Sequence, residues 1–215
     1  KNFFIHSNKS QISLIRIAIN FNDFSKVKNI SDFLKKRGYL VAINLMQSHG
    51  KKESDHIKII KQIKSWNNCD ILYFADSLGS MIPEDVKKLS KIYASNWKKD
   101  FGFHSHNNRT FSLANSVVAI NNGATFIDST ICGMGRGAGN LSTESLLIEL
   151  NNLELHKGSV DKISKISNSF KRLQTIYKWG PNSFYHLASL NNIHPTYIQM
   201  LTSDNRHSDQ QIFDS

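Results

Sequence analysis

The 215-residue sequence predicts an α/β fold in which strands and helices alternate along the chain. Three observations support this prediction. Strand-like apolar runs recur, amphipathic helical patterns separate them, and polar side chains follow the ends of several runs. Strand followed by helix, five times over with a period of roughly 25 to 30 residues, predicts a parallel sheet with right-handed crossovers. Such a sheet occurs in doubly wound folds and in (β/α) barrels.

Five apolar runs are the predicted strands. Their continuous hydrophobicity is typical of strands that are buried on both faces. The runs are "LIRIAI" from Leu14, "LVAINL" from Leu40, "DILYFA" from Asp70, "FGFHSH" from Phe101 and "ATFIDST" from Ala124.

Helical spacing of apolar residues follows the first four strands. After the first strand this spacing continues to Gly38, a residue type suited to a helix C-terminus. Pro83 is suited to the first turn of the third helix, and Gly123 to the end of the fourth. The helices are indicated by Phe24, Val27, Ile30 and Leu34; by Ile57, Ile60, Ile63 and Trp66; by Val86, Leu89 and Tyr93; and by Phe111, Ala114, Val117 and Val118.

Polar residues follow four successive strands, in the segments 44–50, 75–81, 104–108 and 128–140. In a (β/α)8 barrel, functional residues gather at the carboxyl ends of several strands, so this pattern favours a TIM barrel over a doubly wound sheet. We expect a partial barrel domain over residues 1–157. Residues 158–215 read as a helical C-terminal segment with no strand, marked by Ile163, Ile166, Phe170, Leu173 and Tyr177.

Composition excludes several classes of protein. No apolar run approaches the roughly 18 residues that span a bilayer, and the N-terminus lacks the apolar core of a signal peptide, so we expect a cytoplasmic protein without a membrane partner. The formal net charge is +10, but most lysines alternate with Asp and Glu on predicted helix faces, which argues against a nucleic-acid partner. Cys69 and Cys132 read as ordinary reduced thiols.

The segment "FGFHSHNN" carries two histidines in one predicted strand. Side chains alternate faces along a strand, so His104 and His106 point the same way and converge on one spot. A histidine pair with this spacing suits a metal site and suits a structural role about equally well, so its context decides.

A loop with four glycines, "GMGRGAGN", follows the last predicted strand. Without side-chain bulk its backbone amides and Asn140 can approach a ligand closely. The alternative is a flexible loop in which Asn140 only caps a helix that begins near Ser142. The spacing of the glycines matches neither the dinucleotide-binding nor the Walker pattern.

Three motifs occur in order: "ADSLGSMIPEDV", "FGFHSHNNRTFSLANSVVAINNGATFIDST" and "GMGRGAGNLSTE". Together they closely resemble the metal-dependent aldolase and lyase superfamily that includes 4-hydroxy-2-oxo-acid aldolases, hydroxymethylglutaryl-CoA lyase and isopropylmalate synthase. The resemblance covers about residues 13 to 150 and is nearest to the 4-hydroxy-2-oxo-acid aldolases. It implies a TIM barrel in which His104 and His106 bind a divalent cation and Asn140 is a further ligand or a close neighbour. The implied cation is Mn²⁺ or Mg²⁺, with Zn²⁺ as an alternative.

Such a cation would act as a Lewis acid that polarises a 2-oxo acid and stabilises its enolate. We therefore expect a small-molecule 2-oxo acid as the substrate. Asp76 is the candidate catalytic residue, because a carboxylate at the barrel mouth could orient a ligand histidine or bind substrate; a turn or helix-capping role is the alternative. The candidate substrate-binding residues are Asn44, Gln47, Gly135 and Gly137.

One part of the family pattern is missing. The family carries an Arg-Asp pair at the end of its first barrel strand, and no "RD" dipeptide occurs in this sequence. The resemblance matches the five predicted strands to strands four to eight, and five strands cannot close a barrel of eight. We expect an inactive fragment of a longer protein, completed by a missing N-terminal segment or forming a homo-oligomer. The alternative is a non-catalytic barrel remnant that serves as a binding or assembly module.

Overall fold

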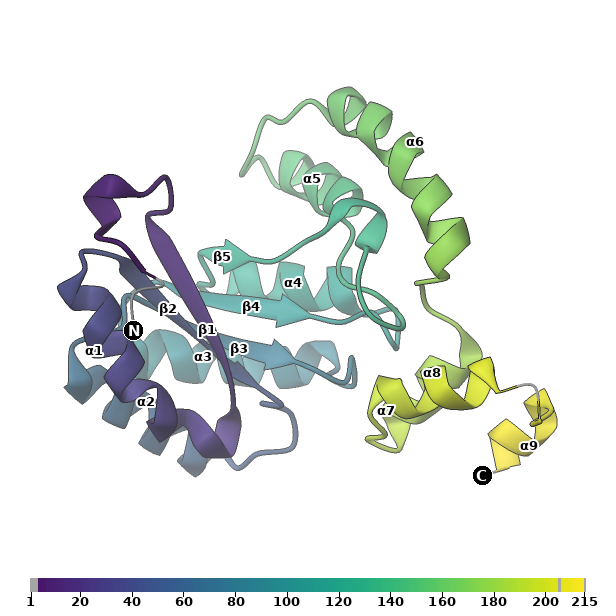
Figure 1. The fold of residues 1–215 in the computed structure, drawn as a ribbon, viewed down its shortest axis with the longest axis horizontal. Helices are drawn as coiled ribbons and strands as arrows, with labels where there is room; N and C mark the ends of the chain where they lie inside the picture. Colours follow the sequence, from purple (N-terminus) through teal and green to yellow (C-terminus); the bar gives the residue numbers. More distant parts are fainter. Residues whose placement is uncertain (1–3, 205, 215) are drawn as a thin grey trace. The chain divides into compact units, whose positions relative to one another are not determined.

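The computed structural model describes residues 4–204 and 206–214 (Figure 1). Within these residues the chain forms two compact units, here named the sheet unit and the loop–helix unit. The sheet unit comprises Lys1–Asp76, Glu84–His104 and Val118–Ile127, and the loop–helix unit comprises Ser77–Pro83, Ser105–Val117 and Asp128–Ser215.

A parallel sheet is the centre of the sheet unit. Its five strands, counted among the described residues, pair in chain order β1-β2-β3-β4-β5. This confirms the predicted α/β class and parallel sheet. The strands are β1 (Leu14–Asn20), β2 (Leu40–Met46), β3 (Ile71–Asp76), β4 (Phe101–Ser105) and β5 (Phe126–Ile127).

The fifth strand is much shorter than the predicted run from Ala124 to Thr130. The chain leaves the sheet after Ile127, and Thr130 instead pairs with Ser142 in an isolated bridge. The Thr130 amide donates to the Leu141 carbonyl at 2.9 Å, and the Thr143 amide donates to the Thr130 carbonyl at 2.9 Å. These bonds satisfy the backbone that the predicted strand would have paired within the sheet.

The helices begin and end at the predicted signals. Pro83 is the first residue of α3, and Gly38, with φ +81°, follows α1, where its amide donates to the Lys35 carbonyl at 2.9 Å. The four helices that follow strands are α1 (Lys28–Lys36), α2 (Glu53–Trp66), α3 (Pro83–Trp97) and α4 (Ser112–Asn121); short 3-10 turns lie at Ser7–Lys9, Phe21–Val27 and Ile131–Gly133.

Helices cover one face of the sheet (Figure 1). On β2, Val41 packs with Leu34 of α1. On β3, the ring of Phe74 lies 4.9 Å from that of Tyr93 on α3. Since Leu45 pairs in register with Phe74, these alternate positions of neighbouring strands share a face. The apolar core therefore lies between this face and the helices.

The opposite face carries a different set of side chains. The Tyr73 ring lies under the Arg16 guanidinium, 4.8 Å from its central carbon, and 6.2 Å from the Phe126 ring. It also fills the space beside Gly102, where any Cβ would overlap the tyrosine ring. This glycine therefore lets a large aromatic side chain cross from β3 over β4.

The described part of residues 158–215 is helical, without a strand. Of the helices there, α6 carries the apolar residues that predicted it, yet Ile166 is 50% exposed and Tyr177 is 73% exposed. None of the described helices is long and apolar enough to cross a membrane. The helices that follow β5 are α5 (Thr143–Asn152), α6 (Val160–Tyr177), α7 (Ser183–Leu190), α8 (Pro195–Ser203) and α9 (Asp209–Asp214).

A buried histidine, His56 of α2, is part of the core. Its ring lies 4.6 Å from that of Phe21 and 6.0 Å from that of Tyr93. Nε2 lies 3.2 Å from the Ser48 carbonyl and therefore carries the donated proton, while Nδ1 is buried with no hydrogen-bond partner among the described residues. Burial lowers the pKa of His56 to about 4.

We predict that His56 makes the fold sensitive to acid. Its pKa in the folded state, about 4, lies below the unfolded value of 6.5, so the folded protein holds the neutral ring. The contribution of the neutral ring to the free energy of unfolding is fully present above pH 6.5. As the pH falls to 4, this free energy decreases by about 3 kcal/mol in total. Urea unfolding of the protein and of His56→Phe across this range measures the effect.

The phenylalanine variant should lose less stability between pH 6.5 and 4 than the unchanged protein does. His156→Phe, at an exposed histidine, is the control and should keep the acid dependence of the unchanged protein. If the free energy of unfolding falls equally between pH 6.5 and 4 in the unchanged protein and in His56→Phe, then His56 is not the source of the acid dependence.

Candidate functional site

The predicted histidine pair lies at the end of β4. Phe103 packs against Phe74 with ring centroids 4.9 Å apart, on the helix-covered face of the sheet. Alternation along β4 puts His104 on the opposite face, with Gly102. His106 continues the extended chain two residues later, where it forms an antiparallel bridge with Asn140. His104 and His106 thus occupy alternate positions of one extended segment, and their convergence on a metal ion stays a prediction.

Asn140 is held beside His106 by backbone contacts within the loop–helix unit. In addition to the bridge, the Asn107 amide donates to the Gly139 carbonyl at 2.9 Å. The side-chain Nδ2 of Asn140 donates to the Met134 carbonyl at 3.0 Å. Its Oδ1 is buried and has no hydrogen-bond partner among the described residues. Burying a carbonyl oxygen without a hydrogen-bond donor costs free energy of folding. Such an oxygen can coordinate a cation or accept a hydrogen bond from a bound molecule.

The glycine loop, residues 133–140, is tightly folded. The Asn140 amide donates to the Gly133 carbonyl at 2.9 Å, and the Gly139 amide donates to the Arg136 carbonyl at 3.1 Å. A Cβ on Gly135 would lie 2.7 Å from Nδ2 of Asn140. Gly135 therefore makes room for the asparagine side chain.

Gly137 is the second candidate substrate-binding glycine of this loop. A Cβ on Gly137 would lie 3.1 Å from the Tyr185 ring, and the residue has φ +62°, so it packs against α7.

The alternative in which Asn140 caps the following helix is wrong. Ser142 is the N-cap of α5, and its side chain accepts from the Ser145 amide.

The loops that follow β3 and β4 are joined to each other. Nη1 of Arg109 donates to the Ser80 carbonyl at 3.0 Å, and Nδ2 of Asn115 donates to the Met81 carbonyl at 2.9 Å. Gly79, with φ +60°, leaves room for Asn108, whose amide nitrogen would lie 2.7 Å from a Cβ there. These contacts fix the segment that directly follows the histidine pair.

Asn108 is a candidate that the sequence reasoning missed. It is 1% exposed, and among the described residues neither its side-chain oxygen nor its nitrogen has a hydrogen-bond partner. Its position directly after "HSHN" is the sequence signal that could have singled it out.

The remaining predicted residues lie in the sheet unit. Asn44 pairs in register with Tyr73 and shares its face; its Oδ1 is buried without a hydrogen-bond partner among the described residues. Gln47 follows β2 with φ 57° and is exposed. Asp76 ends β3 and is 1% exposed. By alternation it belongs with Phe74, facing the helices, and its catalytic role stays a prediction.

The chain is similar to known proteins over most of its length. The HMGL-like family model matches residues 3–169. A 4-hydroxy-2-oxovalerate aldolase of Moorella thermoacetica is 34% identical over 145 residues, which are 67% of this chain and 43% of that protein. The chain thus spans less than half the length of this curated relative.

Solved structures agree with this similarity. The N-terminal domain of a presumed aldolase from Bacteroides vulgatus has a TM-score of 0.83 at 32% identity, covering 94% of this chain and 66% of that one. The HMG-CoA lyase of Brucella melitensis has a TM-score of 0.67 at 14% identity, covering 76% of this chain and 67% of that one, which shows a shared fold alone. The family match confirms the resemblance inferred from the three motifs: this chain belongs to the HMGL-like family.

Proposed function

We propose that the chain supplies the metal-binding part of a carbon–carbon lyase or aldolase that acts on a 2-oxo acid. The observation that carries the proposal is the buried Oδ1 of Asn140, the residue that forms a backbone bridge with His106, because this oxygen has no hydrogen-bond donor among the described residues. Family membership and the aldolase name of the Moorella relative support the same chemistry.

His104, His106 and Asn140 would hold the cation. Two neutral imidazoles and one amide oxygen form a mixed nitrogen and oxygen donor set that suits Mn²⁺ or Zn²⁺, and suits Mg²⁺ less well. The fit is partial, because the described residues contain no group of three or more His, Cys, Asp or Glu side chains that could hold a metal ion. When bound, the cation supplies Lewis-acid polarisation of the substrate carbonyl.

The chain's own residues would bind and orient the substrate. Asn44 shares the sheet face of His104, and its buried amide oxygen, which has no hydrogen-bond partner among the described residues, would accept from a substrate hydroxyl. The glycine loop would let backbone amides approach the substrate carboxylate at Gly135 and Gly137, and Gln47 is proposed as a further substrate-binding residue. Asp76 lies on the opposite face of the sheet from His104, so we assign it no catalytic role in this proposal.

The proposed substrate class is a 4-hydroxy-2-oxo acid, the class named in the Moorella relative. In the cleavage direction the C4 hydroxyl loses its proton, the C3–C4 bond breaks to give an aldehyde, and its electron pair remains on the 2-oxo acid as an enolate. Protonation at C3 then gives the second product. The reverse steps give the condensation.

Catalysis would need further strands. The sheet is open among the described residues, with β1 and β5 at its edges, whereas a barrel requires every strand to be paired on both sides. We propose that another segment or polypeptide, or a further copy of the chain, completes the enclosure and that the 215-residue chain alone does not turn over substrate.

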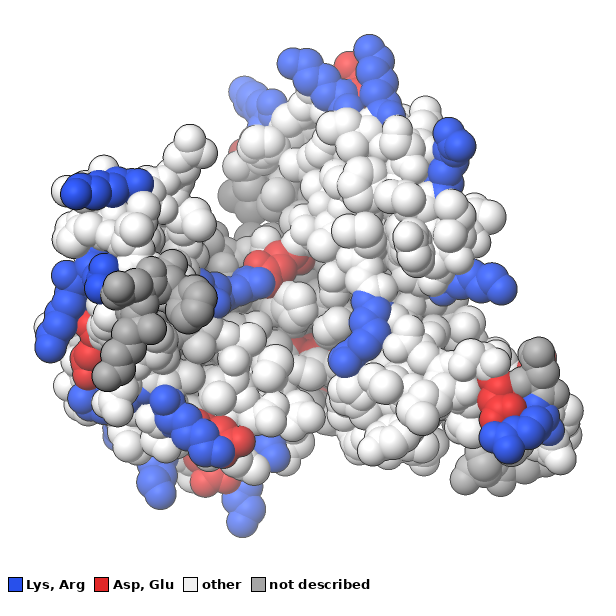
Figure 2. Space-filling model, viewed as in Figure 1, with Lys and Arg blue, Asp and Glu red and all other residues white. Residues whose placement is uncertain are grey.

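The second candidate is a non-catalytic barrel remnant that binds or assembles with a partner. The lack of a three-residue metal cluster among the described residues favours it. It predicts that the chain binds no divalent cation. A nucleic-acid role has less support, because Figure 2 shows Lys and Arg side chains scattered singly or in small groups over the visible face, several beside acidic residues.

Metal binding separates the first candidate from the second. We expect the chain to bind Mn²⁺, and His104→Ala and His106→Ala each to weaken that binding at least about tenfold, because each removes one donor. Titration with Mn²⁺ followed by electron paramagnetic resonance of the free ion measures the affinity. His156→Ala, at an exposed histidine, should leave the affinity unchanged. Equal affinity of His104→Ala and the unchanged chain would exclude the proposed site.

Gly135→Ala tests the role of Asn140. The new Cβ would lie 2.7 Å from Nδ2 of Asn140, so the carboxamide must move, and we expect Mn²⁺ affinity to fall severalfold. Gly158→Ala is the matched control, since the atoms nearest its Cβ belong to the flexible imidazole of His156. The same titration measures both variants. If Gly135→Ala binds Mn²⁺ as the control does, Asn140 is not a ligand.

A further inference from the structure

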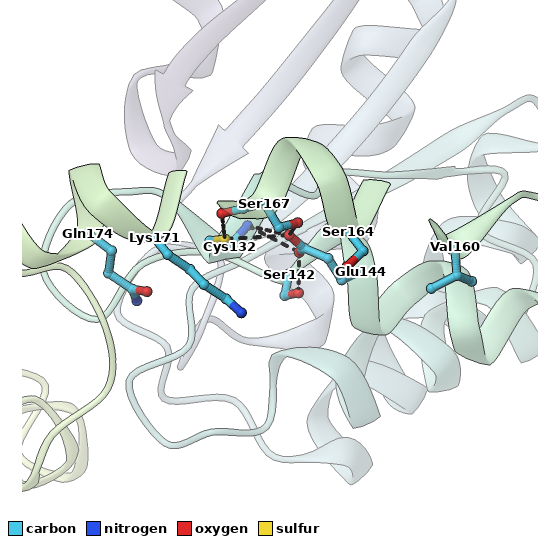
Figure 3. Close-up of a pocket in the computed structure, with 8 residues that line it drawn as sticks. All are labelled: Cys132, Ser142, Glu144, Val160, Ser164, Ser167, Lys171 and Gln174. Atoms are coloured by element: carbon cyan, nitrogen blue, oxygen red, sulfur yellow. Dashed lines mark hydrogen bonds between the residues drawn. The ribbon is translucent and has the colours of Figure 1, made fainter. Parts of the chain in front are cut away.

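The carboxylate of Glu144, a partly exposed residue, accepts hydrogen bonds from Cys132, Ser142 and Ser167. Glu144 lies in the first turn of α5. Its two oxygens accept from the Cys132 amide at 3.0 and 3.1 Å, and one of them accepts from the Ser142 hydroxyl at 2.7 Å. The Ser167 hydroxyl of α6 donates to the other oxygen. Figure 3 shows these side chains converging on the carboxylate.

These donors keep the carboxylate charged. Burial alone would raise the pKa of Glu144, but the hydrogen bonds from Ser167, Ser142 and the backbone amides outweigh it and lower the pKa to about 2. Burial and the neighbouring carboxylate raise the pKa of the Cys132 thiol. The thiol is therefore protonated near neutral pH, which makes a nucleophilic role for Cys132 unsuitable.

The residue that Glu144 holds is in an uncommon conformation. Cys132 has φ 52° and ψ 26°, the left-handed region that non-glycine residues seldom adopt. Its amide is fixed by Glu144, and its carbonyl accepts from Nε1 of Trp179 at 3.0 Å. Both sides of this strained residue are thus fixed by side chains from other elements.

Cys132 is connected to Asn140 through Gly133. The next residue, Gly133, accepts the Asn140 amide at 2.9 Å, and a Cβ on Gly133 would lie 2.9 Å from the Asn140 carbonyl. A rotation of the backbone at Cys132 would therefore move the acceptor that holds Asn140. The path from the carboxylate to Asn140 runs through the hydrogen bonds of the Cys132 amide to Glu144, then through Cys132 and Gly133, and then through one backbone hydrogen bond.

We propose that Glu144 is a positioning residue that sets the conformation of the glycine loop and, through Cys132 and Gly133, the position of Asn140. The purpose of that position, holding a cation, rests on the proposed function. The carboxylate forms part of the wall of a cavity of about 400 Å³ that Lys171 and Gln174 also line, so water can reach the cluster if a donor is lost.

Amide hydrogen exchange tests the positioning itself, without metal or substrate. In Glu144→Gln one carboxylate oxygen becomes an NH₂ group, which cannot accept. We expect exchange of the Cys132 and Asn140 amides to quicken by about tenfold, the loss for a hydrogen bond to a charged group. The core amides of β2 should be unchanged. Ser167→Ala, which removes one donor, should give a smaller effect at the same two amides.

Glu149→Gln is the matched control on the same helix, at a residue outside the cluster, and should leave both amides unchanged. Two outcomes would overturn the proposal. Either the Cys132 amide quickens while the Asn140 amide does not, or the β2 amides quicken equally, which means that Glu144 stabilises the whole fold and has no specific effect on the loop.

A double-mutant cycle with Mn²⁺ affinity tests whether Glu144 acts through Asn140. Introduced alone, Glu144→Gln should weaken Mn²⁺ binding severalfold. Introduced into the Asn140→Ala variant, it should not weaken Mn²⁺ binding any further. Additive losses would show that Glu144 acts by another route and would overturn the proposal. If the unchanged chain binds no Mn²⁺, the proposed function fails, and the exchange experiment alone still decides the role of Glu144.

Discussion

The parallel pairing of β1 to β5 is the constraint on which the other features depend. The carboxyl ends of parallel strands lie at the same end of the sheet. The segments that follow β2, β3 and β4 therefore all begin at that end. The alternation of side chains then decides which residues share a face. It places Asn44 and His104 on the face away from the helices, and it places Asp76 among residues that pack against them.

Local patterns were sufficient to predict most of the elements. The continuous apolar runs marked β1 to β4, and Pro83 and Gly38 marked helix ends, because each depends on residues close in sequence. The prediction failed where distant residues compete: Thr130 pairs with Ser142, which shortens β5. His56 was missed because a histidine among lysines reads as part of a polar helix face, and only the packing of Phe21 and Tyr93 around it shows its burial.

The placement of the two histidines at the end of β4 could be predicted from the sequence because it depends only on a local apolar run, whereas the contacts around them could not. From composition the glycine loop could be a loop of close approach or a flexible loop, and the structure shows close contacts, such as that of Gly135 with Asn140. Glu144 reads as an ordinary acidic residue in a first helical turn. Its importance comes from Cys132 and Ser167, which lie 12 residues before it and 23 residues after it in the chain.

The Tyr73 ring that covers Gly102 has an evolutionary consequence. Any side chain at position 102 would overlap the ring, so a substitution there is tolerable only if position 73 becomes smaller at the same time. If the two positions change one at a time, Tyr73 must therefore be replaced by a smaller residue before Gly102 is replaced. That first step also removes the stacking of the Tyr73 ring with Arg16. Across related sequences these two positions should covary, with a bulky residue at one accompanied by a glycine at the other.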